Sequence, residues 1–207
     1  QKVGKSIVDG TLAIHREMAS RFLPSAVKFH YNFNMRDLAA VLQGLCSIHH
    51  SHVRDGLKVA RLWMHECERV YADRLISNTE IQRCIEIIVD VAKRVIDDDQ
   101  ESLFKQPNAW TTFATQTMDD SRAYLPIKSM ASLKKVLHDQ LNEYNEANAI
   151  MNLVLFDMAM LHVVRIARII GFPQGNALLV GVGGSGKQSL ARLASFICGN
   201  TVTQVAV

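Results

Sequence analysis

Apolar residues recur every three or four positions along most of the chain, and this spacing predicts helices. In the first half, the apolar side chains of each segment fall on one face, with polar and charged residues between them. Segments of this kind bury their apolar faces against one another, so we expect a compact helical bundle. The predicted helices cover residues 3–22, 35–50, 56–75 and 78–95.

Several residues between these segments are typical of helix ends. Pro24 closes the first helix, because proline cannot continue one. Asn34 is the predicted N-cap of the second helix, where its side chain can accept a backbone hydrogen bond. Ser77 and Glu80 have the spacing of a capping box, in which each side chain bonds the backbone N–H of the other residue.

The helical pattern breaks down after residue 96. Asp97–Asp99 places acidic residues at the C-terminal end of a helix, against the helix dipole, and Pro107 and Pro126 indicate an irregular connection. Beyond it we expect helices at 132–149, 151–170 and 188–198, with short parallel strands at 177–180 and 201–207. The fold class is therefore mixed and mainly α, with a helical subdomain at 1–100, a connection at 101–131 and the N-terminal part of an α/β domain at 132–207.

A glycine-rich loop lies between the predicted strand at 177–180 and the helix that follows it. Its sequence is Gly181-Val182-Gly183-Gly184-Ser185-Gly186-Lys187, which has the G-x-x-x-x-G-K spacing of a phosphate-binding loop, or Walker A motif. Glycines let successive N–H groups point at phosphate oxygens, and the helix N-terminus adds partial positive charge. Lys187 would then reach the β- and γ-phosphates. The alternative is a tight strand-to-helix turn in another α/β protein.

The residue after the lysine departs from that pattern. Serine or threonine normally stands there and ligates Mg²⁺ through its hydroxyl, whereas this chain has Gln188, followed by Ser189. One residue is about 100° around a helix, so Ser189 should not point where the usual hydroxyl points. The side-chain carbonyl of Gln188 is a longer and weaker metal ligand. The loop therefore favours nucleotide binding over fast hydrolysis.

Composition narrows the choice of function. The 207 residues are 48% apolar and 21% charged, which is typical of a soluble globular protein, and the formal charge of +3 is too small to indicate nucleic acid. Arg165 and Arg168 interrupt the most apolar stretch, so no membrane span is expected, and no signal peptide is visible. The scattered cysteines are predicted to be buried, reduced thiols of a cytosolic protein: Cys46, Cys67, Cys84 and Cys198.

Two clusters suggest metal ions, and in both the simpler interpretation is favoured. His49, His50 and His52 lie near a helix C-terminus, where histidine suits the dipole, and no cysteine or carboxylate pair completes a tetrahedral set. Asp97–Asp99 lacks the spacing and glycine of a calcium loop and is expected to be solvated. No metal site is predicted beyond Gln188 acting through Mg-nucleotide.

The amino-acid sequences of several segments resemble those of axonemal dynein heavy chains. Residues 153–156, 162–169 and 175–190, with the glutamine after the lysine, closely resemble the start of the fourth AAA+ module of that family. The upstream segments 28–38, 43–45 and 63–71 resemble the small helical lid subdomain that closes the third module. The resemblance covers most of the chain and is weakest between Glu101 and Met130.

This resemblance implies a fragment of a motor protein that hydrolyses ATP and moves along microtubules in the axoneme of a cilium or flagellum. The ligand would be ATP or ADP with Mg²⁺, and the fourth-module site would be regulatory rather than a fast hydrolase. Partners would be the remaining AAA+ modules, dynein intermediate and light chains, and microtubules, with no nucleic acid or membrane. The family's Walker B, first-sensor and arginine-finger residues would lie beyond Val207, so the isolated chain is not expected to hydrolyse ATP.

The resemblance also assigns roles outside the loop. Arg36 matches the second-sensor arginine, which would serve the nucleotide of the third module; the alternative is a surface arginine at a helix start. From their position just before the apolar helix, Leu153, Val154 and Leu155 would wall the adenine pocket, or serve only the core. Two other functions remain open: a structural or interaction fragment with an unoccupied loop, and an unrelated P-loop NTPase such as a transporter ATPase or small-molecule kinase.

Overall fold

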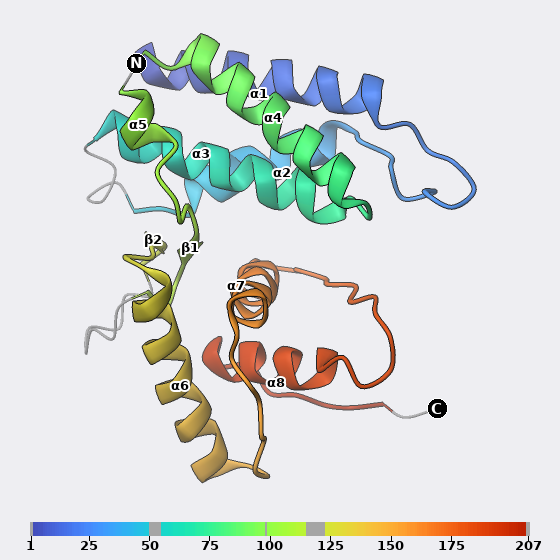
Figure 1. Cartoon of the computed structure of the whole chain (residues 1–207), viewed down its shortest axis with the longest axis vertical. Helices are drawn as coiled ribbons and strands as arrows, with labels where there is room; N and C mark the ends of the chain where they lie inside the picture. The colour runs from blue at the N-terminus through green and yellow to red at the C-terminus, as the bar shows by residue number, and fades with distance from the viewer. Residues whose placement is uncertain (1, 50–54, 98, 115–122, 206–207) are drawn as a thin grey trace. The chain divides into compact units, whose positions relative to one another are not determined.

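The computed structural model describes residues 2–49, 55–97, 99–114 and 123–205. It divides into two compact units, Gln1–Asn108 and Ala109–Val207, which we call the helical unit and the loop-bearing unit (Figure 1). The division lies inside the stretch that the sequence predicts as a connection. The domain boundaries at 100 and 131 and the assignment of each unit to a module stay predictions.

The helical unit contains the predicted bundle. Helices α1 and α4 lie side by side, as do α2 and α3 (Figure 1). The second helix ends at Cys46 rather than at residue 50, and the third passes into a 3₁₀ turn, η2, after Tyr71. The elements are α1 (Lys2–Arg21), α2 (Met35–Cys46), α3 (Gly56–Tyr71), η2 (Ala72–Arg74), α4 (Asn78–Val95) and α5 (Gln100–Leu103).

The predicted cap at Asn34 is confirmed and forms a complete capping box. Its side-chain oxygen accepts from the N–H of Arg36 at 2.8 Å, while the Asp37 carboxylate accepts from the N–H of Asn34 at 2.8 Å. Asp37 is buried and also pairs with the guanidinium of Arg74, which lies over the Phe33 ring. The cap thus ties the start of α2 to η2.

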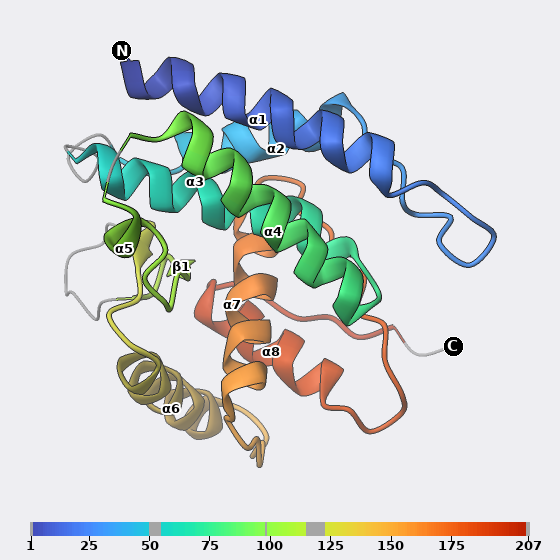
Figure 2. The same ribbon diagram turned by 45° about the horizontal axis from the view of Figure 1, so that its top comes forward.

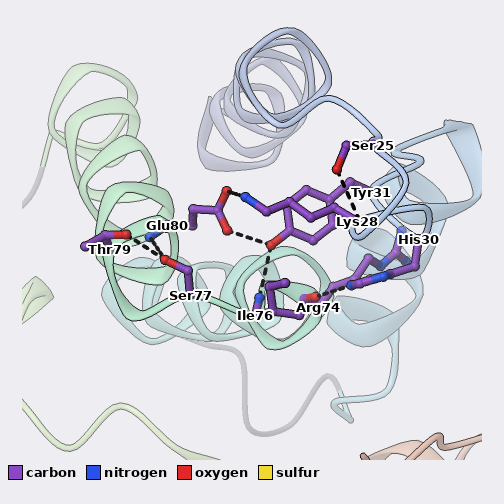
Figure 3. Close-up of polar contacts among 9 residues, drawn as sticks. All are labelled: Ser25, Lys28, His30, Tyr31, Arg74, Ile76, Ser77, Thr79 and Glu80. Atoms are coloured by element: carbon purple, nitrogen blue, oxygen red, sulfur yellow. Dashed lines mark hydrogen bonds and ion pairs between the residues drawn. The ribbon is translucent and has the colours of Figure 1, made fainter.

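The predicted capping box at Ser77 is only half formed. The hydroxyl of Ser77 accepts from the N–H of Glu80 at 3.4 Å, but the Glu80 carboxylate turns away (Figure 3). It accepts from the Lys28 ammonium at 2.6 Å and from the Tyr31 hydroxyl at 2.7 Å, and Tyr31 in turn accepts from the N–H of Ile76 at 3.0 Å. A lysine is a stronger partner for a carboxylate than a backbone amide, so the reciprocal bond is lost.

We expect Glu80→Gln to weaken the helical unit at neutral pH and not in acid. The Lys28 hydrogen bond, followed by that of Tyr31, lowers the pKa of Glu80. A carboxylate with a lowered pKa in the folded state stabilises above its unfolded pKa, and this stabilisation is lost as the pH falls through the folded value. Urea unfolding between pH 7 and pH 3 should show the two proteins converging. Glu86→Gln, an exposed position on the same helix, is the control; equal effects of the two changes would contradict the prediction.

A close contact between α2 and α3 requires glycine at position 44. Glu66 is 0% exposed, and a Cβ atom added to Gly44 would lie 1.7 Å from the Glu66 carboxylate oxygen Oε2. Since Glu66 is enclosed on all sides, it cannot swing into solvent to make room. Gly44 is therefore fixed by packing rather than by backbone conformation.

Gly44→Ala should destabilise the chain by about 2 kcal/mol. Overpacking a closed site costs about 1–3 kcal/mol, more than the gain of up to about 1 kcal/mol in helix propensity. Gly4→Ala in α1 is the matched control, because a Cβ there meets nothing within 4 Å, and it should leave stability unchanged or slightly raised. Urea unfolding followed by circular dichroism measures both; equal stability of the two variants would show that Glu66 moves freely.

The chain leaves the helical unit along a segment fastened to α3. The Arg61 guanidinium donates to the carbonyl oxygens of Ser102 at 2.7 Å, Leu103 at 3.2 Å and Pro107 at 3.4 Å. The Asn108 amide donates to the Arg61 carbonyl at 2.9 Å, and burial lowers the pKa of Arg61. Arg61 thus takes part in four hydrogen bonds that hold this stretch, expected to be irregular from residue 101, against α3.

The described residues of the loop-bearing unit form three helices and a small two-stranded sheet. Helix α7 crosses α8, and α6 packs against both (Figure 2). The mainly helical fold class is confirmed. The elements are β1 (Trp110–Thr111), β2 (Leu125–Pro126), which pairs antiparallel with β1, α6 (Met130–Ala147), α7 (Asp157–Gly171) and α8 (Lys187–Ile197).

Two expectations for this unit are wrong. The apolar helix begins at Asp157, not at residue 151, because the segment before it is held by Asn145, whose side chain accepts from the Met151 N–H at 2.7 Å and donates to its carbonyl at 3.3 Å. Residues 177–180 and 201–205 are not strands, and residues 206–207 lie outside the described part of the chain. A strand requires a neighbour for its backbone groups, and these segments pair with none of the described residues.

The cysteines are only partly as predicted. Cys67 and Cys84 are buried in the helical unit, and burial raises the pKa of Cys84 to about 12, but Cys46 is exposed. The side chains of all four are thiols rather than halves of disulfides. Within the described ranges, no helix has the length and apolar character needed to cross a membrane.

Candidate phosphate-binding loop

Two glycines of the glycine-rich loop have the left-handed conformation that the sequence predicts. Gly184 and Gly186 have φ values of 73° and 76°, in the left-handed region that residues with a Cβ rarely adopt. Gly186 is the N-cap of α8, and its carbonyl accepts from the N–H of Leu190 at 2.9 Å. The loop therefore leads directly into the first turn of a helix, whose first N–H groups have no partner within the helix.

Lys187, the first residue of α8, turns its side chain back over the loop. Its ammonium donates to the carbonyl oxygens of Gly181 and Val182, both at 2.6 Å, and to the hydroxyl of Ser185 at 3.0 Å. An ammonium has three protons, so these acceptors use them all. The contacts draw residues 181–185 around one positive charge, and the N–H of Ser185 bonds the carbonyl of Val182 at 3.4 Å.

Helix α8 gives the loop a rigid base. Its inner face is buried among α6 and α7, and Cys198, just beyond its end, donates a weak bond to the carbonyl of Ala167 at 3.6 Å. Gln188 is exposed at the outer face, whereas Ser189 is half-buried. The two side chains therefore point in different directions, as the helical period requires. The residues buried on the inner face are Leu190, Leu193, Ala194 and Ile197.

The other predicted site residues lie outside the loop, and the structure gives their exposure and contacts but no shared binding site. Leu153 is half-buried and packs against the core of the loop-bearing unit, while Val154 is 77% exposed, and their place in an adenine pocket stays a prediction. Arg36 is exposed in the first turn of α2, with its backbone N–H bound by Asn34. Of the suggested histidines, His49 is described, and His50 and His52 lie outside the described residues.

Sequence reasoning missed two residues that fix the backbone of the loop-bearing unit outside the loop itself. Asn145 fixes the segment that carries Leu153 and Val154, and nothing local in the sequence announces a bond to Met151. Gly175 lies in the turn after α7, where an added Cβ would be 1.7 Å from the carbonyl oxygen of Ile169. The glycine itself was a signal, since a close backbone approach is a common reason for one.

Two family models match this chain. Residues 7–106 match the AAA+ lid domain, and residues 151–207 match the P-loop containing dynein motor region D4. Three known proteins are similar over the whole chain: the flagellar outer arm dynein beta chain of Chlamydomonas reinhardtii at 50% identity, the ciliary dynein beta chain of Heliocidaris crassispina at 48%, and human dynein axonemal heavy chain 17 at 45%. The chain spans about 5% of the length of each relative.

A helical AAA+ lid followed by a glycine-rich loop at the start of a helix places the chain among AAA+ proteins. It belongs to the dynein heavy chain family, as the match to the dynein motor region and the identity over the whole chain show. The expected family is confirmed, and the alternative of an unrelated P-loop NTPase is wrong.

Proposed function

We propose that the loop-bearing unit binds ATP or ADP through residues 181–189, as part of an AAA+ module of a ciliary or flagellar dynein heavy chain. The proposal rests on the position of the Lys187 ammonium. It lies against the backbone of the loop, where it donates to two carbonyls, at the N-terminus of α8. Positive charge, free helical N–H groups and left-handed glycines in one place suit a polyphosphate.

The glycines, Lys187 and Gln188 would each make a different contribution to nucleotide binding. Gly184 and Gly186 turn the backbone so that its N–H groups face the anion, and the α8 dipole adds partial positive charge beneath it. Lys187 would exchange its carbonyl partners for phosphate oxygens, which are charged and therefore stronger acceptors. Mg²⁺ would neutralise part of the phosphate charge, with the exposed Gln188 as its weak protein ligand.

A glutamine in place of the usual hydroxyl supports a regulatory role for this site rather than fast hydrolysis. In the whole protein, such a site would influence the motor cycle by binding and releasing nucleotide between modules. The helical unit would be the lid of the third module, with Arg36 as its second-sensor residue. Similarity to axonemal, flagellar and ciliary dyneins supports placement in the axoneme, with the other modules, intermediate and light chains, and microtubules as partners.

A structural role without nucleotide is the second candidate. It is favoured by the three acceptors that already satisfy the Lys187 ammonium within the loop. In that case the lysine would serve to fold the loop, and binding experiments would find no nucleotide. The two candidates make opposite predictions for the titrations described next.

Lys187→Ala should weaken ADP and ATP binding by about tenfold or more. A hydrogen bond to a charged group contributes about 1.5–3 kcal/mol, and 1.4 kcal/mol is a factor of ten in affinity. Isothermal titration of the 207-residue chain, with and without Mg²⁺, measures the change. Lys134→Ala, at an exposed position on α6, is the matched control and should bind as the parent does. Equal binding by Lys187→Ala and the parent, or no binding by the parent, would contradict the proposal.

Gln188→Thr should make ATP binding more dependent on Mg²⁺, because it restores a short hydroxyl ligand at the usual position. Gln188→Val has the shape of threonine without the hydroxyl, so it separates metal ligation from any change in helix packing. The ratio of ATP affinities with and without Mg²⁺ should rise only in the threonine variant. A fall in that ratio for both variants would mean that Gln188 already ligates the ion.

A further inference from the structure

The hydroxyl of Ser185 differs in kind from the other two acceptors of the Lys187 ammonium. The other two are main-chain carbonyls, which every residue at positions 181 and 182 would supply. Ser185 contributes the only side-chain acceptor of the three, at 3.0 Å from the lysine nitrogen Nζ. We propose that Ser185 is a positioning residue that holds Lys187 in the loop and thereby weakens and slows nucleotide binding, an inference that rests on the proposed function.

The geometry of the loop keeps this hydroxyl in place. The N–H of Ser185 is bonded to the carbonyl of Val182, so the backbone that carries the hydroxyl is tied to the same turn. A Cβ atom added to Gly181 would lie 3.2 Å from Ser185 Oγ and 3.6 Å from Lys187 Nζ. The Gly181 backbone therefore lies close to both the serine oxygen and the lysine nitrogen. Because position 181 has no side chain, there is room for both groups.

The energetic consequence follows from the number of donors. Because all three ammonium protons already have partners, phosphate oxygens gain the lysine only when loop acceptors give it up. Each acceptor that stabilises the lysine within the loop lowers the affinity for phosphate by the same free energy, as for any competing equilibrium. Removing the serine hydroxyl leaves one ammonium proton free and should favour binding.

A direct contact between the hydroxyl and phosphate would have the opposite effect. If Ser185 donated to a phosphate oxygen, its loss would weaken binding. The sign of the change in affinity therefore distinguishes a residue that restrains the lysine from one that binds the ligand. A purely structural role would change neither the reactivity of Lys187 nor the association rate in the direction proposed.

The test compares Ser185→Ala, Ser185→Thr and the parent in the 207-residue chain, using ADP and ATP as probes. Ser185→Ala should bind about three- to tenfold more tightly, with a faster association rate, because one bond to an exposed charged donor is lost. Ser185→Thr keeps the hydroxyl and should behave as the parent. Ser195→Ala, on α8 and away from the loop, is the control for removing a serine hydroxyl from this unit.

A second measurement needs no nucleotide. Brief labelling with an amine-reactive ester, followed by peptide mass spectrometry, reports how freely the Lys187 amine reacts, with Lys134 as the internal reference. Labelling of Lys187 should rise about threefold in Ser185→Ala and stay unchanged in Ser185→Thr. Unchanged labelling, or affinity that is equal or weaker in Ser185→Ala, would overturn the inference. If the parent binds and Lys187→Ala does not, such a result leaves the proposed function standing; if the parent does not bind, both fail.

Discussion

The packing of α8 against α7 is the interaction on which the candidate site depends. Burial of Leu193, Ala194 and Ile197 fixes the axis of α8, and with it the direction of the N-terminal turn where the loop ends. Tyr144 adds an edge contact from α6 to Phe196, with ring centroids 5.4 Å apart. A loop rich in glycine has little preference of its own, so it obtains its position from the helix that follows it.

In each unit, one basic side chain donates hydrogen bonds to several main-chain carbonyls. In the helical unit, Arg61 gathers the carbonyls of Ser102, Leu103 and Pro107 at the exit of the chain. In the loop-bearing unit, Lys187 gathers two carbonyls and a hydroxyl. Main-chain carbonyls in the last turn of a helix or in irregular segments need donors, and a long basic side chain supplies several at once. The arginine is a fixed fork, whereas the lysine ammonium rotates freely and can exchange partners, which suits a binding loop.

Features set by neighbouring residues were predictable from the sequence. The caps at Asn34 and Ser77, the helices of the bundle and the glycine conformations of the loop depend on contacts within a few residues. Features set by distant residues were not. Glu80 binds Lys28, 52 residues away, instead of completing its box. The strand expected at 177–180 failed for the same reason, because a strand is defined by a partner rather than by its own apolar pattern.

The contact between Gly44 and Glu66 has an evolutionary consequence. The two positions share one closed volume, so neither can change size independently of the other. A lineage that acquired a larger residue at position 44 would first need a shorter one at 66, which leaves a cavity, whereas the reverse order would pass through a steric clash. Substitutions at these sites should therefore be inherited as a pair, and the pair offers a marker for tracing how this helical unit diverged.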